Sequence, residues 1–112
     1  MSKITTHVLD TSLGRPAAGV HITLELMKSS GFKEIARGVT NDDGRVSDLI
    51  GDQSLVAGVY KITFETKDYF AASGRPAFYP SVPIIFEVGK AEEHYHVPLL
   101  LSPFGYSTYR GS

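Results

Sequence analysis

The sequence predicts an all-β fold: an antiparallel β-sandwich of seven to eight short strands in two sheets, with one short helix. Apolar and polar residues alternate with a period of two in several short segments, as they do in strands that bury one face. Turn-forming residues separate these segments at a spacing typical of sandwiches. The chain has 112 residues, of which 42% are hydrophobic, so it can build the core of one domain, which we place at residues 1–112.

The first half of the chain is expected to contain three strands. Residues 4–9 are extended, and residues 20–27 alternate between apolar and polar side chains. Residues 33–40 carry β-branched side chains, and residues 29–31 form the hairpin loop that joins this strand to the one before it. The sequence Asn-Asp-Asp-Gly at residues 41–44 predicts a turn, because Asn, Asp and Gly tolerate left-handed backbone angles.

The second half of the chain is expected to contain the helix and four more strands. Residues 59–65 again alternate, and residues 67–73 have the amphipathic pattern of a short helix, with Gly74 as its C-terminal stop. Residues 75–83 hold three prolines and are mostly loop, with Pro83 placed at the beginning of a strand or at a sheet edge. The remaining strands are expected at residues 82–88, 93–101 and 104–110.

Composition and charge exclude several classes of protein. Lys plus Arg number 11 and Asp plus Glu number 12, so the formal net charge is -1 and a nucleic-acid partner is not expected. The absence of cysteine removes disulfides, thiolate nucleophiles and cysteine-ligated metals. The first residues lack the apolar segment of a signal peptide, and no apolar run is long enough to span a membrane. We therefore expect a cytoplasmic protein; a periplasmic location would need a leader that was removed, and the last three residues do not form a peroxisomal signal.

Histidines are the first candidates for chemistry, because imidazole titrates near neutral pH, although a single histidine in a strand is more commonly an ordinary surface residue. His94 and His96 are two apart in an expected strand, so they share one face and point away from the core. Pro98 and Leu100 continue this outward face as apolar residues, which suggests a subunit contact with His96 in the wall of an interfacial pocket. The opposite face, expected in the core, carries Tyr95, Val97, Leu99 and Leu101.

Three further features could take part in chemistry. His7 lies in the first strand, and Arg45 is either a solvated turn residue or a guanidinium aimed at substrate carbonyls. The last residues are either a frayed end or a group of aromatic, cationic and small polar groups for a ligand, which Gly111 would allow to approach the backbone closely. Two histidines with one residue between them are a metal-ligand spacing, but no third ligand is visible in the sequence, so no metal is predicted.

Five blocks of residues, spread along essentially the whole chain, carry a family resemblance. They are Ile-Thr-Thr-His-Val-Leu-Asp at 4–10 with Gly-Arg-Pro-Ala at 14–17, Thr-Asn-Asp-Asp-Gly-Arg at 40–45, Phe-Tyr-Pro at 78–80, His-Tyr-His-Val-Pro-Leu-Leu-Leu-Ser-Pro at 94–103 and Tyr-Arg-Gly-Ser at 109–112. Together they resemble the transthyretin-like proteins. The last block resembles the 5-hydroxyisourate hydrolases of that superfamily and not the hormone carrier transthyretin. Tyr79, where many members have Phe, is a mild departure.

The resemblance implies a fold, an assembly and an activity. The fold is a transthyretin-like sandwich of two sheets with one short helix, and the assembly is a homotetramer, a dimer of dimers, with active sites in channels at the dimer–dimer interface. The activity is the hydrolysis of 5-hydroxyisourate to 2-oxo-4-hydroxy-4-carboxy-5-ureidoimidazoline in purine catabolism, after the oxidation of urate. No metal or organic cofactor takes part in that reaction.

The resemblance also implies roles for individual residues. It suggests no role for His21, which we treat as structural, or for His94, which is at most a neighbour of the site. The residues of the final block belong to a motif that closes the pocket. The expected catalytic residues are His7, Arg45, His96 and Ser112, and the expected substrate-binding residues are His7, Arg45, Tyr109, Arg110 and Gly111.

The mechanism that we expect is an attack of water on the ring amide, assisted by histidine. Such a hydrolysis needs a base for the water, an acid for the leaving nitrogen and a donor for the developing oxyanion. His7 and His96 would act as base and acid, in an order that the sequence leaves open, and Ser112 would act through its hydroxyl or its terminal carboxylate. A serine nucleophile is disfavoured because no strained strand-to-helix turn surrounds Ser112. The alternative function is a transthyretin-type carrier that binds an aromatic, hormone-like ligand without catalysis.

Overall fold

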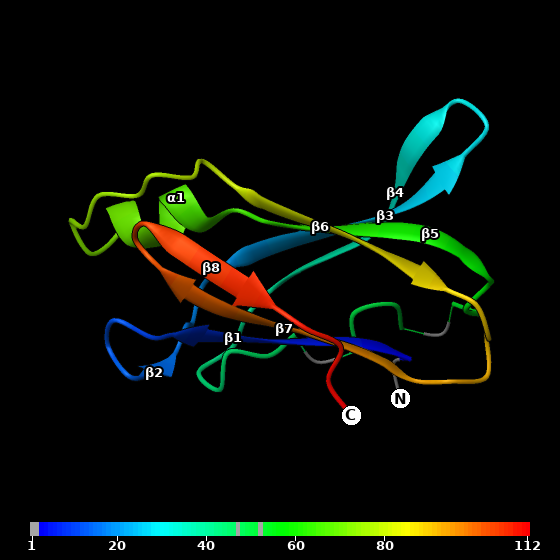
Figure 1. The fold of residues 1–112 in the computed structure, drawn as a ribbon, viewed down its shortest axis with the longest axis horizontal. Coiled ribbons are helices and arrows are strands. Elements are labelled where there is room, and N and C mark those ends of the chain that lie inside the picture. The colour runs from blue at the N-terminus through cyan, green and yellow to red at the C-terminus, as the bar shows by residue number, and fades with distance from the viewer. Residues whose placement is uncertain (1–2, 47, 52) are drawn as a thin grey trace.

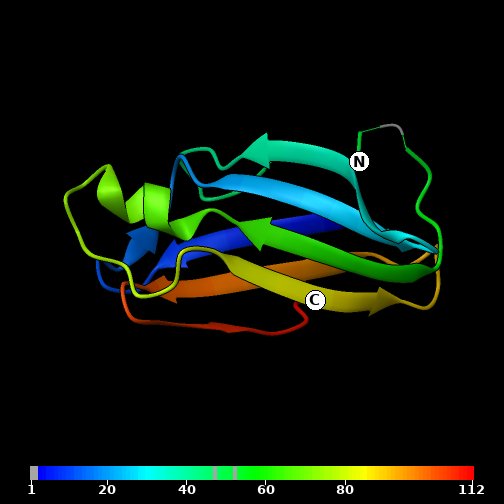
Figure 2. The ribbon, with the colours of Figure 1, turned by 90° about the horizontal axis from the view of Figure 1, so that it is seen from above.

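Two four-stranded sheets pack against each other as a sandwich (Figures 1 and 2). The computed structural model describes residues 3–46, 48–51 and 53–112. One sheet has the strand order β2-β1-β7-β8 and the other β4-β3-β5-β6. The elements are β1 (Ile4–Asp10), β2 (Arg15–Pro16), β3 (His21–Lys28), β4 (Gly31–Val39), β5 (Gly58–Phe64), α1 (Thr66–Ala71), β6 (Val82–Val88), β7 (Tyr95–Ser102) and β8 (Gly105–Thr108).

The core lies between the two sheets and is built by the alternating residues, as the sequence predicts. In β3, β5 and β7 every second side chain is buried, because successive side chains of a strand point to opposite faces of the sheet. Each fully buried apolar side chain contributes about 1.5–3 kcal/mol to the free energy of unfolding. The largest side chains in this core include Tyr60, Phe64, Phe70, Ile22, Leu24 and Leu99.

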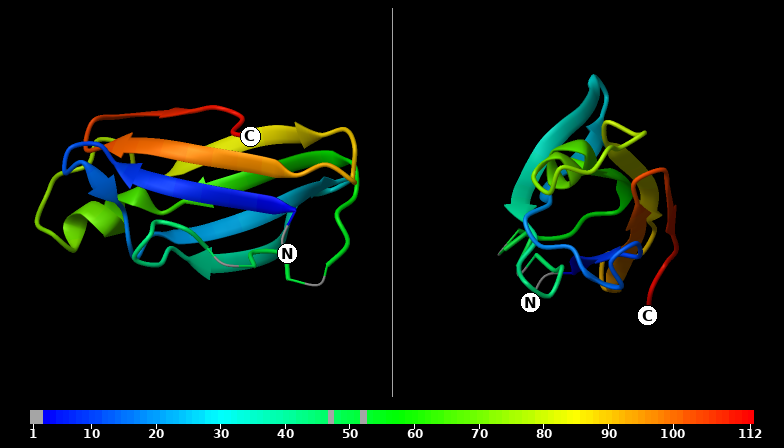
Figure 3. Two further views of the ribbon diagram at one scale, coloured as in Figure 1. Left: turned by 90° about the horizontal axis from the view of Figure 1, so that it is seen from below. Right: turned by 90° about the vertical axis from the view of Figure 1, so that its left-hand side faces the viewer.

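One strand pair differs from the antiparallel pattern that the sequence predicts. β1 and β7 are parallel, and their arrowheads lie at the same end of the sheet (Figure 3, left). The pairing runs from Ile4 opposite Tyr95 to Asp10 opposite Leu101. Strands so far apart in the sequence are not joined by a hairpin, so the alternation of their residues gives no information about their relative direction.

Most predicted elements are confirmed, with shifts at their ends. The helix α1 is present but begins and ends earlier than the predicted 67–73, and Gly74 follows it with a φ of +69°. Pro83 lies in β6, which is the edge strand of its sheet, as expected for a residue without a backbone N–H. The short β2 was not predicted. Among the described residues, no helix combines the length and the apolar character needed to cross a membrane. The prediction of one domain over residues 1–112 includes residues 1, 2, 47 and 52, which lie outside the described residues.

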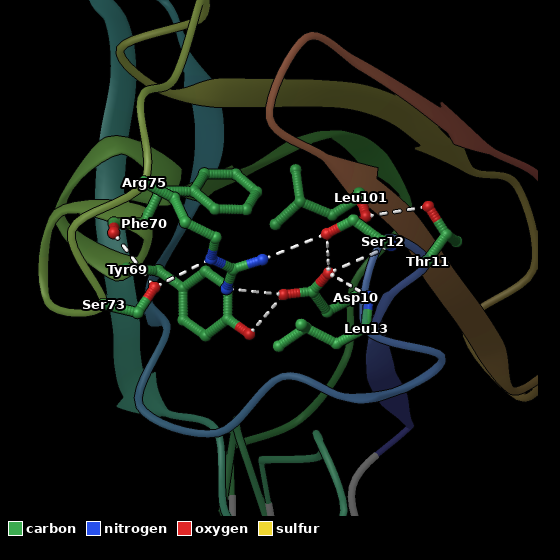
Figure 4. A network of polar contacts seen from close by, with 9 residues as sticks. All are labelled: Asp10, Thr11, Ser12, Leu13, Tyr69, Phe70, Ser73, Arg75 and Leu101. Atoms are coloured by element: carbon green, nitrogen blue, oxygen red, sulfur yellow. Dashed lines mark hydrogen bonds and ion pairs between the residues drawn. The ribbon is translucent and has the colours of Figure 1, made fainter.

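A buried carboxylate at the end of β1 ties this strand to the helix (Figure 4). The side chain of Asp10 is 0% exposed and pairs with the guanidinium of Arg75 at 2.8 Å. The hydroxyl of Tyr69 donates to the same carboxylate at 2.7 Å, and Ser12 donates to it through both its hydroxyl and its backbone N–H. Leu13 donates its backbone N–H as well. Residues far apart in the sequence therefore hold α1 against the end of the strand that carries His7.

These contacts decide the protonation of Asp10. Burial alone raises the pKa of this carboxyl, but hydrogen bonds from Arg75, Ser12 and Tyr69 outweigh burial and lower the pKa from 3.8 to about 2. A carboxyl with a lowered pKa stabilises the fold above its unfolded pKa, and this contribution, about 2 kcal/mol, is lost as the pH falls through the folded pKa.

We predict that Asp10→Asn lowers the free energy of unfolding by about 2 kcal/mol at pH 7, because the partly buried Arg75 loses its partner charge. The difference between the two proteins should shrink between pH 3.8 and about pH 2, as Asp10 of the unsubstituted protein becomes protonated. Denaturant unfolding at a series of pH values measures it, and Asp43→Asn, on an exposed turn, is the matched control. Equal stability of the Asp10 and Asp43 variants at pH 7 would contradict this account.

Candidate active site

His7 and His96 lie on the outer face of the first sheet, on the neighbouring strands β1 and β7. In β1 the side chains of Ile4, Thr6 and Val8 are buried, so the residues between them face outward. The parallel register places Thr5 opposite His96, so that His7 lies one step further along the sheet. Adjacent strands are about 4.8 Å apart, and the two imidazoles therefore belong to one cluster.

Arg45 joins this cluster because the turn at residues 41–44 docks on the free side of β1. The backbone N–H of Val8 donates to the carbonyl of Gly44 at 2.8 Å, and Arg45 forms a bridge with His7. Gly44 has a φ of +75°, and its lack of a Cβ allows the turn to lie directly against the β1 backbone. The side chain of Asn41 accepts hydrogen bonds from the backbone N–H groups of Asp43 and Arg45, which fixes the shape of the turn.

The tail after β8 lies across His96. β8 ends at Thr108 because Pro98 has no N–H to continue the ladder, and the hydroxyl of Thr108 donates to the Pro98 carbonyl at 2.7 Å instead. The ladder resumes in the same register at Gly111, whose N–H donates to the carbonyl of His96 at 2.9 Å. A Cβ at Gly111 would lie 2.5 Å from Cδ2 of His96, so only glycine allows the tail to pass so close to the imidazole.

The structure brings some of the other predicted tail residues near His96 and turns one away. Tyr109 is 59% exposed and lines a groove together with His96. Arg110 lies over the ring of Tyr95, with 4.5 Å between Cζ and the ring centroid, and pairs with Glu93 at 3.1 Å. Tyr95 belongs to the core face of β7, so Arg110 holds the tail from the side opposite His96. Ser112 follows Gly111 and is exposed.

The apolar outward face that the sequence predicts beyond His96 is present, but part of it is already covered. Pro98 is buried within the single chain, because the tail at Gly111 packs against its ring. Leu100 is half-buried and lies opposite the half-buried Leu9 of β1. The subunit contact expected on this face stays a prediction.

Sequence reasoning missed one member of the cluster, Thr5. Its hydroxyl oxygen lies 2.8 Å from Nδ1 of His96 and 2.9 Å from Nε2 of His94. The two imidazole rings are 6.4 Å apart and nearly parallel, at 17°. His94, expected to be at most a neighbour, is thus linked to His96 through Thr5. The period-two spacing of Thr5 and His7 was a signal that could have found it.

The surroundings of His96 hold its imidazole in the neutral form. Burial lowers the pKa of His96 below the ordinary 6.5, and the nearby charges of Arg45, His94 and His7 lower the pKa further. A neutral imidazole at pH 7 can accept a proton, as a general base must. In the described part of the chain, no group of three or more His, Asp or Glu side chains is arranged to hold a metal ion. His21 is exposed on β3, in the other sheet.

Comparisons with known proteins agree with this picture. The sequence matches the HIUase/Transthyretin family over residues 4–111. It is 48% identical to the 5-hydroxyisourate hydrolase 2 of Rhizobium meliloti, over 98% of this chain and 96% of that protein. The match to the crystal structure of sea bream transthyretin in complex with thyroxine covers 98% of this chain and 95% of that chain, at 33% identity and a TM-score of 0.93. The match to the structure of Klebsiella pneumoniae 5-hydroxyisourate hydrolase covers 97% of this chain and 92% of that chain, at 38% identity and a TM-score of 0.85.

The two structures confirm the transthyretin-like sandwich but do not distinguish the two functions, because the transthyretin has the higher TM-score of the two. Sequence identity has the opposite order, with the two hydrolases, at 48% and 38%, ahead of the transthyretin, at 33%. The match over residues 4–111 and the identity over nearly the whole chain lead to one conclusion. The chain belongs to the HIUase/Transthyretin family.

Proposed function

We propose that this protein is an enzyme that hydrolyses 5-hydroxyisourate to 2-oxo-4-hydroxy-4-carboxy-5-ureidoimidazoline. One observation carries the proposal: His7, His96 and Arg45 meet on one face, with the Tyr-Arg-Gly-Ser tail packed across His96. A carrier of an apolar ligand has no need of such a set of acid–base groups. The relatives named 5-hydroxyisourate hydrolase, at 42% to 48% identity, support the same activity.

In the proposed mechanism, water attacks a carbonyl carbon of the ring and the carbon–nitrogen bond then breaks. One of the two histidines takes a proton from the water, and the leaving nitrogen receives a proton from a histidine. The neutral state of His96 suits it to the base role, although two adjacent imidazoles share their protons. Arg45 orients the substrate and stabilises the negative charge that develops on oxygen. The proposal includes no cofactor.

Within this proposal, the tail completes the site. Tyr109, which is 59% exposed, contacts the substrate ring, and Ser112 supplies hydrogen bonds. Gly111 provides the close approach of the backbone to His96. The contacts of Arg110 with Glu93 and Tyr95 favour a role in anchoring the tail.

We further propose that the site is completed by assembly. The cluster lies on an open sheet face beside the half-buried Leu9 and Leu100, and a second copy would cover this face. A homotetramer, arranged as a dimer of dimers with its sites at the dimer–dimer interface, would exclude water from the substrate. We also propose that the protein acts in urate breakdown in the cytoplasm. Sedimentation analysis of the purified protein tests the assembly.

A direct assay separates the two candidate functions. Urate and urate oxidase generate 5-hydroxyisourate, whose ultraviolet absorbance decays slowly without an enzyme. Acceleration of this decay by the purified protein supports the hydrolase. No acceleration, together with tight binding of thyroxine, would instead support a carrier.

We predict that His7→Ala and His96→Ala each lower kcat/KM by about 100- to 10,000-fold, because each removes a proton-transfer group. Arg45→Ala should lower kcat/KM by about 100- to 1,000-fold through the loss of charge stabilisation. His21→Ala, at an exposed histidine of the other sheet, is the matched control and should leave turnover unchanged. Unchanged turnover in all three site variants, with the assembly intact, would show that the site is wrongly assigned.

The pH profile should report the neutral state of His96. We predict that kcat/KM falls in acid with an apparent pKa below 6.5. Protonation of His96 removes the base, and the lowered pKa of His96 shifts this protonation to lower pH. Stopped-flow measurements between pH 5 and pH 8, on 5-hydroxyisourate generated immediately beforehand, would measure the profile. A fall that begins well above 6.5 would be inconsistent with the surroundings of His96.

We predict that Gly111→Ala lowers kcat/KM by roughly 10- to 100-fold, because the added Cβ forces the tail or the imidazole of His96 to move. The matched control is Gly105→Ala on β8, where the nearest atom to an added Cβ is Ser102 Oγ at 3.8 Å. Equal activity of the two alanine variants would rule out a close approach at Gly111 as a requirement for catalysis.

A further inference from the structure

The hydroxyl of Thr5 couples two imidazoles. It lies 2.8 Å from Nδ1 of His96 and 2.9 Å from Nε2 of His94, and both distances are those of hydrogen bonds. A hydroxyl has one proton and two lone pairs, so it can donate to only one of these nitrogens but can accept from either. The protonation of the two rings is therefore linked: while both hydrogen bonds exist, at least one of the two nitrogens carries a proton.

This link decides which nitrogen of His96 is free. His96 is neutral, since burial and the charges of Arg45, His94 and His7 all lower its pKa, and it therefore carries one ring proton. If Thr5 accepts from Nδ1–H of His96, the lone pair at Nε2 is available to take a proton. If Thr5 donates to Nδ1, Nε2 carries the proton and His96 cannot act as a base.

Two contacts favour the first arrangement. A hydrogen bond with the backbone of Thr5 raises the pKa of His96, as a bond does in which a ring N–H donates, and Nδ1 is the ring nitrogen that lies beside Thr5. His94 is exposed, so it can keep its own proton at Nδ1 in contact with water while its Nε2 accepts from Thr5. The hydrogen bonds then run from His96 to Thr5 and from Thr5 to His94.

We propose that Thr5 is a positioning residue that, with His94 as its acceptor, holds His96 in the tautomer protonated at Nδ1 and leaves Nε2 free as the base. The tautomer does not depend on the proposed function, whereas its effect on turnover rests on that function. Threonine and serine can both make the two hydrogen bonds, and valine, which has nearly the same shape, can make neither.

Nitrogen NMR of protein labelled with ¹⁵N in histidine tests the tautomer without any substrate. We expect His96, assigned by comparison with His96→Gln, to show a protonated Nδ1 and an unprotonated Nε2 near pH 7. Thr5→Val should shift His96 towards the tautomer protonated at Nε2, and Thr5→Ser should restore the original pattern. A proton on Nε2 of His96 in the unsubstituted protein, or an unchanged pattern in Thr5→Val, would overturn the proposal.

Kinetics test the consequence. We expect Thr5→Val to lower kcat by roughly 10- to 100-fold with little change in KM, as the loss of an outer partner of an essential histidine does. Thr5→Ser should remain close to the unsubstituted enzyme, as should Thr23→Val, a matched control on β3 in the other sheet. His94→Ala should lower kcat as Thr5→Val does. The variant that carries both substitutions should have a kcat no lower than that of the more impaired single variant.

The two arms distinguish the possible failures. If the unsubstituted protein does not hydrolyse 5-hydroxyisourate, the proposed function fails and the NMR pattern still decides the tautomer. If it does hydrolyse 5-hydroxyisourate and Thr5→Val keeps full kcat, the role of Thr5 is refuted. Unfolding midpoints show whether each variant is folded. Should Thr5→Val not fold, His94→Ala at an exposed position removes the same hydrogen bond, and an unchanged His96 tautomer in that variant refutes the proposal.

Discussion

The parallel pairing of β1 with β7 is the constraint on which the site depends. It joins a strand near the start of the chain to one near its end, and its register puts Thr5 beside His96 and His7 beside Pro98. A shift of one residue would turn every side chain of β1 to the other face and bury His7 in the core. The buried Asp10 at the end of β1, tied to Arg75 and Tyr69, resists such a shift because its carboxylate would lose its partners.

Close packing around His96 links the architecture to the chemistry. The tail presses against one side of the imidazole at Gly111, and the turn that carries Arg45 docks on the far side of β1. Burial and positive charge then keep the ring neutral, which is the state that a base requires. The transthyretin of sea bream has nearly the same backbone arrangement. The sandwich is thus a scaffold, and the side chains on its outer face decide what it does.

Much of the fold could be predicted from the sequence, because it rests on local patterns. Period-two alternation located β3, β5 and β7, Gly74 marked the end of the helix, and Pro83 was correctly placed on an edge strand. The parallel direction of β1 and β7 was not predicted, since alternation reports which face is buried and not which strand lies alongside. The short β2 has too few residues to form a pattern.

For the candidate site, the sequence by itself determined the available chemical groups, His7, His96, Arg45 and the tail, and that His94 and His96 share a strand face. The tertiary structure alone decided their neighbours. Hydrogen bonds between β1 and β7 bring Thr5 between His94 and His96, and continuation of the β8 ladder past Pro98 places Gly111 on His96. These contacts join residues up to 91 positions apart. No local pattern encodes them, because they exist only after the sheet has formed and fixed its register.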